Sequence, residues 1–195
     1  MVQERESVKN ANTNFKSMSD IKTAYEKVIR GKLMKAHGYT SPLAPPRLIK
    51  IVVNTGIGRV RDEKEIQTVE KYFSMIVGQK AHARPAKKSK SSFKSRQGMI
   101  IGFSATLRGR RMYDFLSRLI NIALPRSRDF RGIPSSSVDE SGNLSIGIKE
   151  HIAFPEIIGE DVKHIFGLEA TLVVKARNRE EALDLYREFG VPLKK

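Results

Sequence analysis

Segment 99–108 limits the fold most, because its apolar and polar side chains alternate residue by residue. This alternation predicts a β-strand with one face in a core and the other toward solvent. The outward side chains are small, so they predict a flat face that a nucleic-acid backbone can approach closely; an ordinary solvent-facing strand is the alternative. The inward residues are Met99, Ile101, Phe103, Ala105 and Leu107, and the outward residues are Gly102, Ser104, Thr106 and Arg108.

The next segment, 110–123, has the apolar spacing of a helix. Apolar residues recur every three or four positions, which predicts an amphipathic helix with one stripe in the core. Pro125 restricts the backbone of Leu124, so we expect the helix to end there. The stripe consists of Met112, Phe115, Leu116, Leu119, Ile120 and Ala123.

The remaining elements follow from the same kinds of pattern and from capping residues. Ser19, Asp62 and Asn178 are expected to cap helices. The fold class is therefore predicted to be α+β, a mainly antiparallel β-sheet with helices packed on one face and a long basic loop at 84–98. We expect helices at about 19–37, 62–77 and 178–189, strands at 48–55, 80–83 and 168–176, and a hairpin turn at 139–143.

Two of these segments carry specific predictions about which side chains are buried. The first helix is expected to bury one apolar stripe, and the strand at 48–55 is expected to separate its core face from its outer face. The helix stripe is Ile21, Tyr25, Val28 and Ile29; the strand's core face is Ile49, Ile51 and Val53, and its outer face is Lys50, Val52 and Asn54.

The length of 195 residues suits one domain. We expect a disordered polar extension at 1–18 and a single α+β domain at 19–195. Segment 1–17 has no apolar core and carries Glu4 and Glu6, so it does not resemble a targeting peptide. The absence of cysteine excludes disulfides and thiolate metal sites, and it fits a reducing, cytoplasmic setting. No stretch approaches the ~18 uncharged apolar residues of a membrane span.

The net charge of +15 is concentrated in one part of the chain. Segment 71–113 holds 11 of the 36 basic residues and none of the 21 acidic ones. A solvated surface normally mixes both signs, so a long acid-free segment indicates a positive field that attracts a polyanion. Nucleic acid is the favoured partner, and an anionic membrane surface is the minor alternative.

Residues that carry catalysis or bind metals do not form a motif. The histidines His37, His82, His151 and His164 lack metal-ligand spacing, and each is expected at the surface or in a loop. Gly56-Ile57-Gly58 lacks the third glycine of a dinucleotide fingerprint and is expected to form a tight turn. We therefore predict a non-enzymatic RNA-binding protein without metal or cofactor. A nuclease with a basic cleft and a free RNA chaperone or membrane-surface binder are the competing hypotheses.

Several motifs in collinear order connect the chain to a known family. From about Tyr25 to Leu193 the chain resembles the bacterial-type large-subunit ribosomal protein five, the universal family that binds 5S rRNA. The motifs are Pro46-Arg47-Leu48-Ile49-Lys50-Ile51-Val52-Val53-Asn54, Gly56-Ile57-Gly58, Gly78-Gln79-Lys80, Phe93-Lys94-Ser95-Arg96-Gln97-Gly98, Thr106-Leu107-Arg108-Gly109, Ala123-Leu124-Pro125-Arg126, Arg128-Asp129-Phe130-Arg131-Gly132, Gly147-Ile148-Lys149-Glu150 and Phe154-Pro155-Glu156-Ile157.

The resemblance implies an antiparallel sheet whose open face, with the first helix, holds 5S rRNA. It also implies nearby large-subunit rRNA, peptidyl-site tRNA and a protein of the small-subunit head as partners, the last through the region 154–161. The family's 5S-contacting positions fall on Asn54, Gln79 and Thr106, and we expect Lys50 and Arg108 to join them. The loop toward tRNA contributes Lys87, Lys88, Ser89, Lys90, Phe93, Lys94 and Arg96, and further RNA contacts are expected from Arg110, Arg111, Arg126, Arg128 and Arg131.

The chain departs from the family pattern at four positions. Ser92 stands where a glycine usually precedes Phe93, and Arg110 replaces a usual glutamate. Pro85 and Lys90 are unusual at their positions. These changes add charge to the loop or stiffen it, so they bear on the tRNA contact and not on RNA binding as such.

Overall fold

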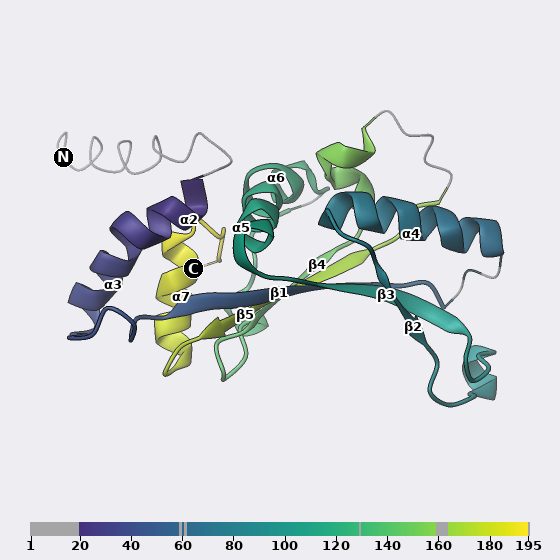
Figure 1. The fold of residues 1–195 in the computed structure, drawn as a ribbon, viewed down its shortest axis with the longest axis horizontal. Helices are drawn as coiled ribbons and strands as arrows, with labels where there is room; N and C mark the ends of the chain where they lie inside the picture. Colours follow the sequence, from purple (N-terminus) through teal and green to yellow (C-terminus); the bar gives the residue numbers. More distant parts are fainter. Residues whose placement is uncertain (1–19, 59, 61, 129, 159–163, 195) are drawn as a thin grey trace.

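The computed structural model describes residues 20–194 apart from 59, 61, 129 and 159–163. The helices at 63–77, 109–118 and 124–126 lie on one side of a central sheet, the helix at 179–188 lies at one end of it, and a hairpin projects from the other end (Figure 1). This arrangement confirms the predicted α+β class. The expected extension at 1–18 and the Ser19 cap lie outside the described residues.

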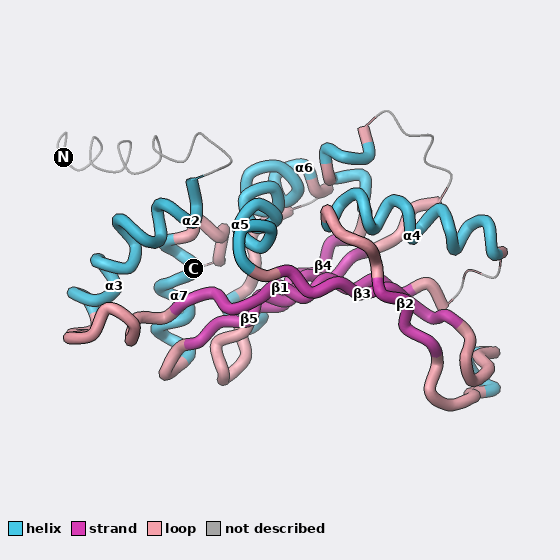
Figure 2. Tube along the Cα trace, in the orientation of Figure 1, coloured by secondary structure: helices cyan, strands magenta, loops and turns pink. Residues whose placement is uncertain are grey.

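The sheet contains five strands in the order β2-β3-β1-β5-β4, and every neighbouring pair is antiparallel. Figure 2 shows β1 and β3 running through the middle of the molecule. The central position of β1 places its outer face among four other strands. The strands are β1 (Arg47–Gly56), β2 (His82–Pro85), β3 (Ile100–Leu107), β4 (Leu144–Ile148) and β5 (Leu168–Lys175).

Helical segments of three kinds accompany the sheet. The α-helices are α2 (Asp20–Ala24), α3 (Arg30–Ala36), α4 (Glu63–Val77), α5 (Gly109–Arg118), α6 (Leu124–Arg126) and α7 (Arg179–Glu188). Two π-helical turns continue them, η1 (Tyr25–Ile29) and η3 (Leu119–Ala123). Short 3-10 turns are η2 (Ser91–Phe93), η4 (Ser135–Ser137), η5 (His151–Ala153) and η6 (Pro155–Ile157).

The inner sheet face and the helices share one hydrophobic core. Ile51, Phe73 and Phe115 are fully buried where β1, α4 and α5 meet. Tyr186 of α7 donates hydrogen bonds to the backbone oxygens of Gly142 and Leu172, at 2.8 and 3.2 Å. This face-specific burial is what the alternating strands predicted.

The predicted core face is wrong at two strand positions. Ile49 is 40% exposed because a register shift between Leu48 and Lys50 turns Leu48 into the core instead. Such a bulge reverses the alternation on one side of it. Ile101 is 39% exposed because it lies where β3 leaves the covering helices and continues toward the hairpin.

The first helix is also built differently from the prediction. A π-helical turn at 25–29 interrupts it, and Ile21, Tyr25, Ile29 and Leu33 form the buried stripe. Val28 is 53% exposed, so its predicted place in the stripe is wrong. Gly38 directly follows the helix predicted at 19–37 and ends the segment with φ +65°, the left-handed conformation common after helix ends.

The helix at 109–126 buries its whole predicted stripe but does not end before Pro125. Leu124 keeps helical dihedral angles, and Pro125 lies in the first turn of α6. The preceding π-helical turn explains this, because the N–H of Leu124 bonds to the oxygen of Leu119, five residues back. A wider turn relieves the clash that a proline ring makes in a regular α-helix.

Local capping signals were predicted correctly. The Asp62 side chain accepts a hydrogen bond from the Lys64 N–H at 3.0 Å, and the Asn178 side chain accepts one from the Glu181 N–H at 3.0 Å.

The turn at 139–143 is present, but only the isolated bridge between Val138 and Leu144 extends it. The short strand lies at 82–85, two residues later than expected.

Candidate nucleic-acid interface

The sheet has an open face, which we define as the outward side chains of β1, β3, β4 and β5. Asn54 lies between Ser104 and Glu169 across the strands, and Gly147 follows in β4. In the next row Thr106, Val52, Thr171 and Ser145 lie side by side. No helix of the described residues covers this row, and Thr106 remains exposed. The open face predicted for Asn54 and Thr106 is therefore present.

The open face is not uniformly flat, contrary to the prediction. Arg84 of the edge strand β2 donates from its Nε to Ser104 Oγ at 2.6 Å, and Ser104 is only 4% exposed. Gly102 is buried because β1 passes very close: a Cβ there would lie 2.5 Å from the Thr55 oxygen. Flatness is limited to the part around Thr106, Val52 and Thr171.

Gln79 and Thr106 are brought together as a pair. The Gln79 amide donates from Nε2 to the backbone oxygen of Thr106 at 3.3 Å, which fixes the amide beside the strand. Gln79 as a whole is partly exposed. Lys50 is half-buried on β1, and Arg108 is exposed just before α5. We use the name polar row for Gln79, Thr106 and, in the adjacent row of the sheet, Asn54. Arg108 adds a cation two residues after Thr106.

The segment predicted as a loop is folded as a hairpin, which we call the basic hairpin (84–98). Ala86 N–H donates to the Met99 oxygen at 2.8 Å, and Gly98 N–H donates to the Ala86 oxygen at 3.0 Å. Near the tip, Lys90 and Ser95 exchange backbone hydrogen bonds at 3.0 and 3.1 Å. The sequence pattern missed this ladder because Lys and Ser runs carry no strand alternation.

The lysines and Arg96 of the basic hairpin are exposed to solvent, whereas Arg84 at its base bonds to Ser104. Lys94 turns the chain at the tip with φ +49°, a conformation that non-glycine residues seldom adopt. No ion pair joins the hairpin's cations to a carboxylate within the part of the chain that the structure describes. All seven residues predicted for the loop toward tRNA are exposed: Lys87, Lys88, Ser89, Lys90, Phe93, Lys94 and Arg96.

An apolar hollow of about 1000 Å³ lies beside the basic hairpin. Phe93, Ile101 and Ile165 contribute exposed apolar surface to its wall, and Phe93 is 70% exposed. Lys87, Lys88 and Lys90 line the same hollow. The hairpin thus combines cations with an exposed aromatic ring, which are the two side-chain types that hold a nucleotide.

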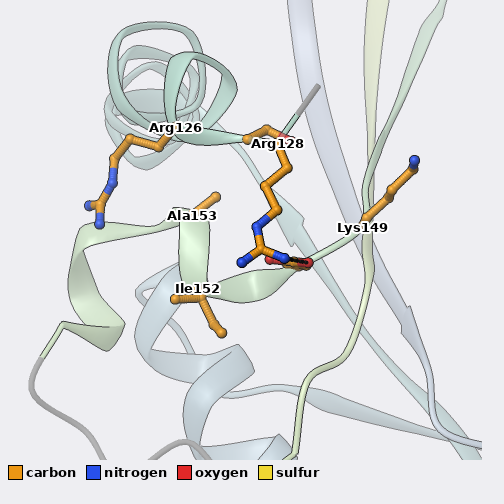
Figure 3. Close-up of a pocket in the computed structure, with 7 residues that line it drawn as sticks. Arg126, Arg128, Lys149, Ile152 and Ala153 are labelled. Atoms are coloured by element: carbon orange, nitrogen blue, oxygen red, sulfur yellow. Dashed lines mark ion pairs between the residues drawn. The ribbon is translucent and has the colours of Figure 1, made fainter. Parts of the chain in front are cut away.

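The five arginines predicted as further RNA contacts are all exposed but do not form one cluster. Arg110 and Arg111 begin α5 and share the wall of one cavity with Gly78, beside the polar row. Arg126 and Arg128 line another cavity, of about 460 Å³, together with Lys149 and Glu150 (Figure 3). Arg131 lies outside both linings.

One prediction about the histidines is wrong. His151 is fully buried, stacked on Phe166 with ring centroids 4.0 Å apart, and its Nδ1 accepts the Phe166 N–H at 3.3 Å. Burial lowers the pKa of His151 below its ordinary value of 6.5. This imidazole holds the chain after β4 against the chain before β5, which is a structural role.

Two acidic residues near the arginines are paired within the protein. Glu156 forms an ion pair with Arg118, and Glu150 lies 3.8 Å from Arg128. Among the described residues no group of three histidine, aspartate or glutamate side chains is arranged to hold a metal ion. None of the helices searched in the described segments is long and apolar enough to cross a membrane.

Together these features define a class of protein, an α+β protein that presents a polar sheet face and a cationic hairpin to a polyanion. Comparisons with known proteins identify the family. Residues 41–96 match the family "Ribosomal protein L5", and residues 100–193 match the model of the C-terminus of the same ribosomal protein family.

The "Large ribosomal subunit protein uL5" of Mesoplasma florum is 46% identical over 91% of this chain and 99% of its own length. The proteins of the same name from Mycoplasma pneumoniae and Alkaliphilus metalliredigens are 45% and 43% identical, each over 91% of this chain, and over 99% and 100% of their own lengths. The chain belongs to the ribosomal protein L5 family. It is thus a structural, non-enzymatic ribosomal protein, which confirms the predicted class.

Three residues of the candidate interface were not predicted as site residues from the sequence. Arg84 covers Ser104, Glu169 lies next to Asn54, and Lys149 lines two cavities. The outward positions Ser145, Gly147 and Lys149 repeat the small-then-charged alternation of segment 99–108. That repetition was the available signal for Lys149.

Proposed function

We propose that this protein is a component of the large ribosomal subunit that binds 5S rRNA through its open sheet face. The single observation that carries this proposal is the solvent-accessible polar row of Asn54, Thr106 and Gln79, with no helix of the described segments over it. Folded RNA is recognised largely by shape and by its 2′-hydroxyls, which a small, polar and fixed surface can meet. Lys50, Arg108, Arg110 and Arg111 supply charge around the row.

The basic hairpin is proposed to reach a second RNA, the peptidyl-site tRNA. Its cations are exposed, and its ladder hydrogen bonds give the tip a defined direction away from the sheet (Figure 2). Phosphate contacts release counterions, so this interaction should weaken steeply with salt. Pro85 and Lys90 leave the hairpin intact, since β2 continues through Pro85 and Lys90 pairs with Ser95.

A bridge to a protein of the small-subunit head is proposed for region 154–161, restricted to its exposed part. Phe154 and Ile157 are buried and pack in the core, so they serve the fold. Ile158 is 64% exposed and is the residue of this region best placed to meet a partner. Residues 159–161 lie outside the described part of the chain.

The substitution Thr106→Arg tests the sheet-face proposal. An arginine there crowds the polar row, so 5S rRNA should bind about tenfold or more weakly at moderate salt. A gel-shift titration with 5S rRNA, against a control tRNA, measures the change. Unchanged 5S affinity would refute the placement of the RNA on this face. A metal-dependent cleavage assay on the same RNA should show no cleavage.

A further inference from the structure

Two cavities of the molecule share one lysine at the free edge of the sheet. A groove of about 440 Å³ lies at the ends of β1, β4 and β5, with Asn54 on its wall. We call it the glycine groove, because Gly56, Gly147 and Gly167 line it. The second cavity, the arginine pocket, is lined by Arg126, Arg128, Lys149 and Glu150. Lys149 lines both, so the two cavities meet at this residue.

Strand geometry explains how one residue reaches both sides. Lys149 directly follows the edge strand β4 and has the outward parity of Ser145 and Gly147, so it belongs to the open face. Glu150, the next residue, has the inward parity, and its Oε1 lies 3.8 Å from Arg128 Nη1 on the helix side of the sheet. The two faces of the sheet therefore meet between these neighbouring residues, and no further strand of the described chain lies beyond β4.

The cations of the arginine pocket fan out instead of converging on one point. Figure 3 shows Arg126 and Arg128 coming from the end of the helix and Lys149 pointing away from both, on the strand side. All three side chains are exposed, and the exposed ion pair of Arg128 with Glu150 does not occupy its guanidinium. Diverging cations suit successive phosphates of a strand better than a single anion.

We infer that an RNA strand held on the open face continues from the glycine groove around the β4 edge, with successive phosphates on Lys149, Arg128 and Arg126. This inference rests on the proposed 5S rRNA site and extends it to the helix side. The glycine groove has no side chains at three of its positions, so the RNA backbone can approach closely. Glu169 beside Asn54 can accept a hydrogen bond from a ribose 2′-hydroxyl, which fits RNA and not DNA.

The test compares the full-length protein with the triple variant Arg126→Ala, Arg128→Ala, Lys149→Ala. Its affinity for 5S rRNA at about 0.1 M salt should fall about tenfold or more, and its log–log salt slope should become shallower by about two. The matched control is Arg187→Ala on α7, an exposed arginine that is ion-paired with Asp184 and remote from both cavities. It should bind like the wild type. Unchanged thermal melting would show that the triple variant is folded.

A second variant has the opposite expected sign. Glu150→Gln removes the one carboxylate among the described residues that line the arginine pocket, so 5S rRNA should bind about two- to threefold more tightly. Hydroxyl-radical footprinting adds a direct readout: the triple variant should lose protection only in a run adjoining the nucleotides covered by the open face.

The outcomes separate this inference from the proposed function. If the triple variant binds 5S rRNA with wild-type affinity and salt slope while Thr106→Arg binds weakly, the edge path is wrong and the sheet-face site stands. If the triple variant binds 5S rRNA normally but no longer joins large subunits, the pocket serves another partner and the inference is overturned. If neither the triple variant nor Thr106→Arg changes the affinity for 5S rRNA, the proposed function itself is wrong and the edge path is refuted with it.

Discussion

The open face and the basic hairpin are the two surfaces that we propose for RNA binding, and they are built in opposite ways. On the open face, strands on both sides fix Asn54, whereas Thr106 has β1 on one side and the Gln79 amide bonded to its backbone oxygen; the side chains are small and mostly uncharged. On the basic hairpin, lysines extend into solvent from a two-stranded ladder. From this difference we propose that the open face determines which RNA is bound and that the basic hairpin adds affinity for any phosphate backbone.

Neutralising the hairpin should give the largest effect. The triple variant Lys87→Ser, Lys88→Ser, Lys90→Ser removes three exposed cations, so affinity for 5S rRNA and control tRNA should both fall, by about 30-fold or more at about 0.1 M salt. Anisotropy titrations measure both affinities. Because these residues are exposed, the melting temperature should stay within a few degrees of the wild type. A melted core would contradict the assignment of the hairpin as a binding element.

Gly102→Ala tests how closely β1 and β3 pack beneath the open face. A Cβ at this position would lie 2.5 Å from the Thr55 oxygen, so β1 and β3 would have to separate. We expect the free energy of unfolding to fall by about 1–3 kcal/mol in urea titrations. Gly147→Ala is the matched control, since a Cβ there meets nothing within 4 Å. Equal stability of both variants would argue against the close strand contact.

Asn54→Ala tests whether the face carries selectivity. Removing one amide that bonds to RNA should weaken 5S rRNA binding about five- to tenfold and leave control tRNA binding unchanged. Competition between the two RNAs gives the ratio directly. Asn121→Ala, an exposed position on η3, serves as the control and should not change the ratio. An equal loss of affinity for both RNAs would mean that Asn54 does not contribute to selectivity for 5S rRNA, which would contradict the prediction.

His151 predicts a modest dependence of stability on pH. Its folded pKa is lowered by burial, so the unfolded chain takes up a proton first as the pH falls. The stabilisation is complete above the ordinary value of 6.5 and is lost as the pH falls from there toward the folded pKa. Urea titrations at about pH 7.5 and about pH 5.5 should show a larger loss for the wild type than for His151→Gln. Equal losses would contradict the account.

Local signals in the sequence were enough for the two capped helix starts and for the strand types, but not for the helix end at Pro125. Asp62 and Asn178 cap helices as predicted because a cap depends on three or four neighbouring residues. Ile49 and Val28 were placed wrongly because a bulge and a π-helical turn each shift the periodicity by one residue. Such irregularities depend on packing with β5, α5 and α7, which no window of the sequence contains.

The functional surface was predictable to a similar extent. The outward parity of Asn54 and Thr106 followed from alternation alone. The covering of Ser104 by Arg84 did not, because it needs the register of β2 against β3. The meeting of Lys149 with Arg126 and Arg128 also needed the tertiary fold, since over 20 residues separate them in the sequence.

The division between the two surfaces is tested most directly by one set of salt titrations. Binding of 5S rRNA and control tRNA is measured for the wild type, the hairpin triple variant and Thr106→Arg. The hairpin variant should keep its preference for 5S rRNA with a salt slope shallower by about two to three, whereas Thr106→Arg should keep the slope and lose the preference. A hairpin variant that loses the preference, or a Thr106→Arg protein that retains it, would contradict the account.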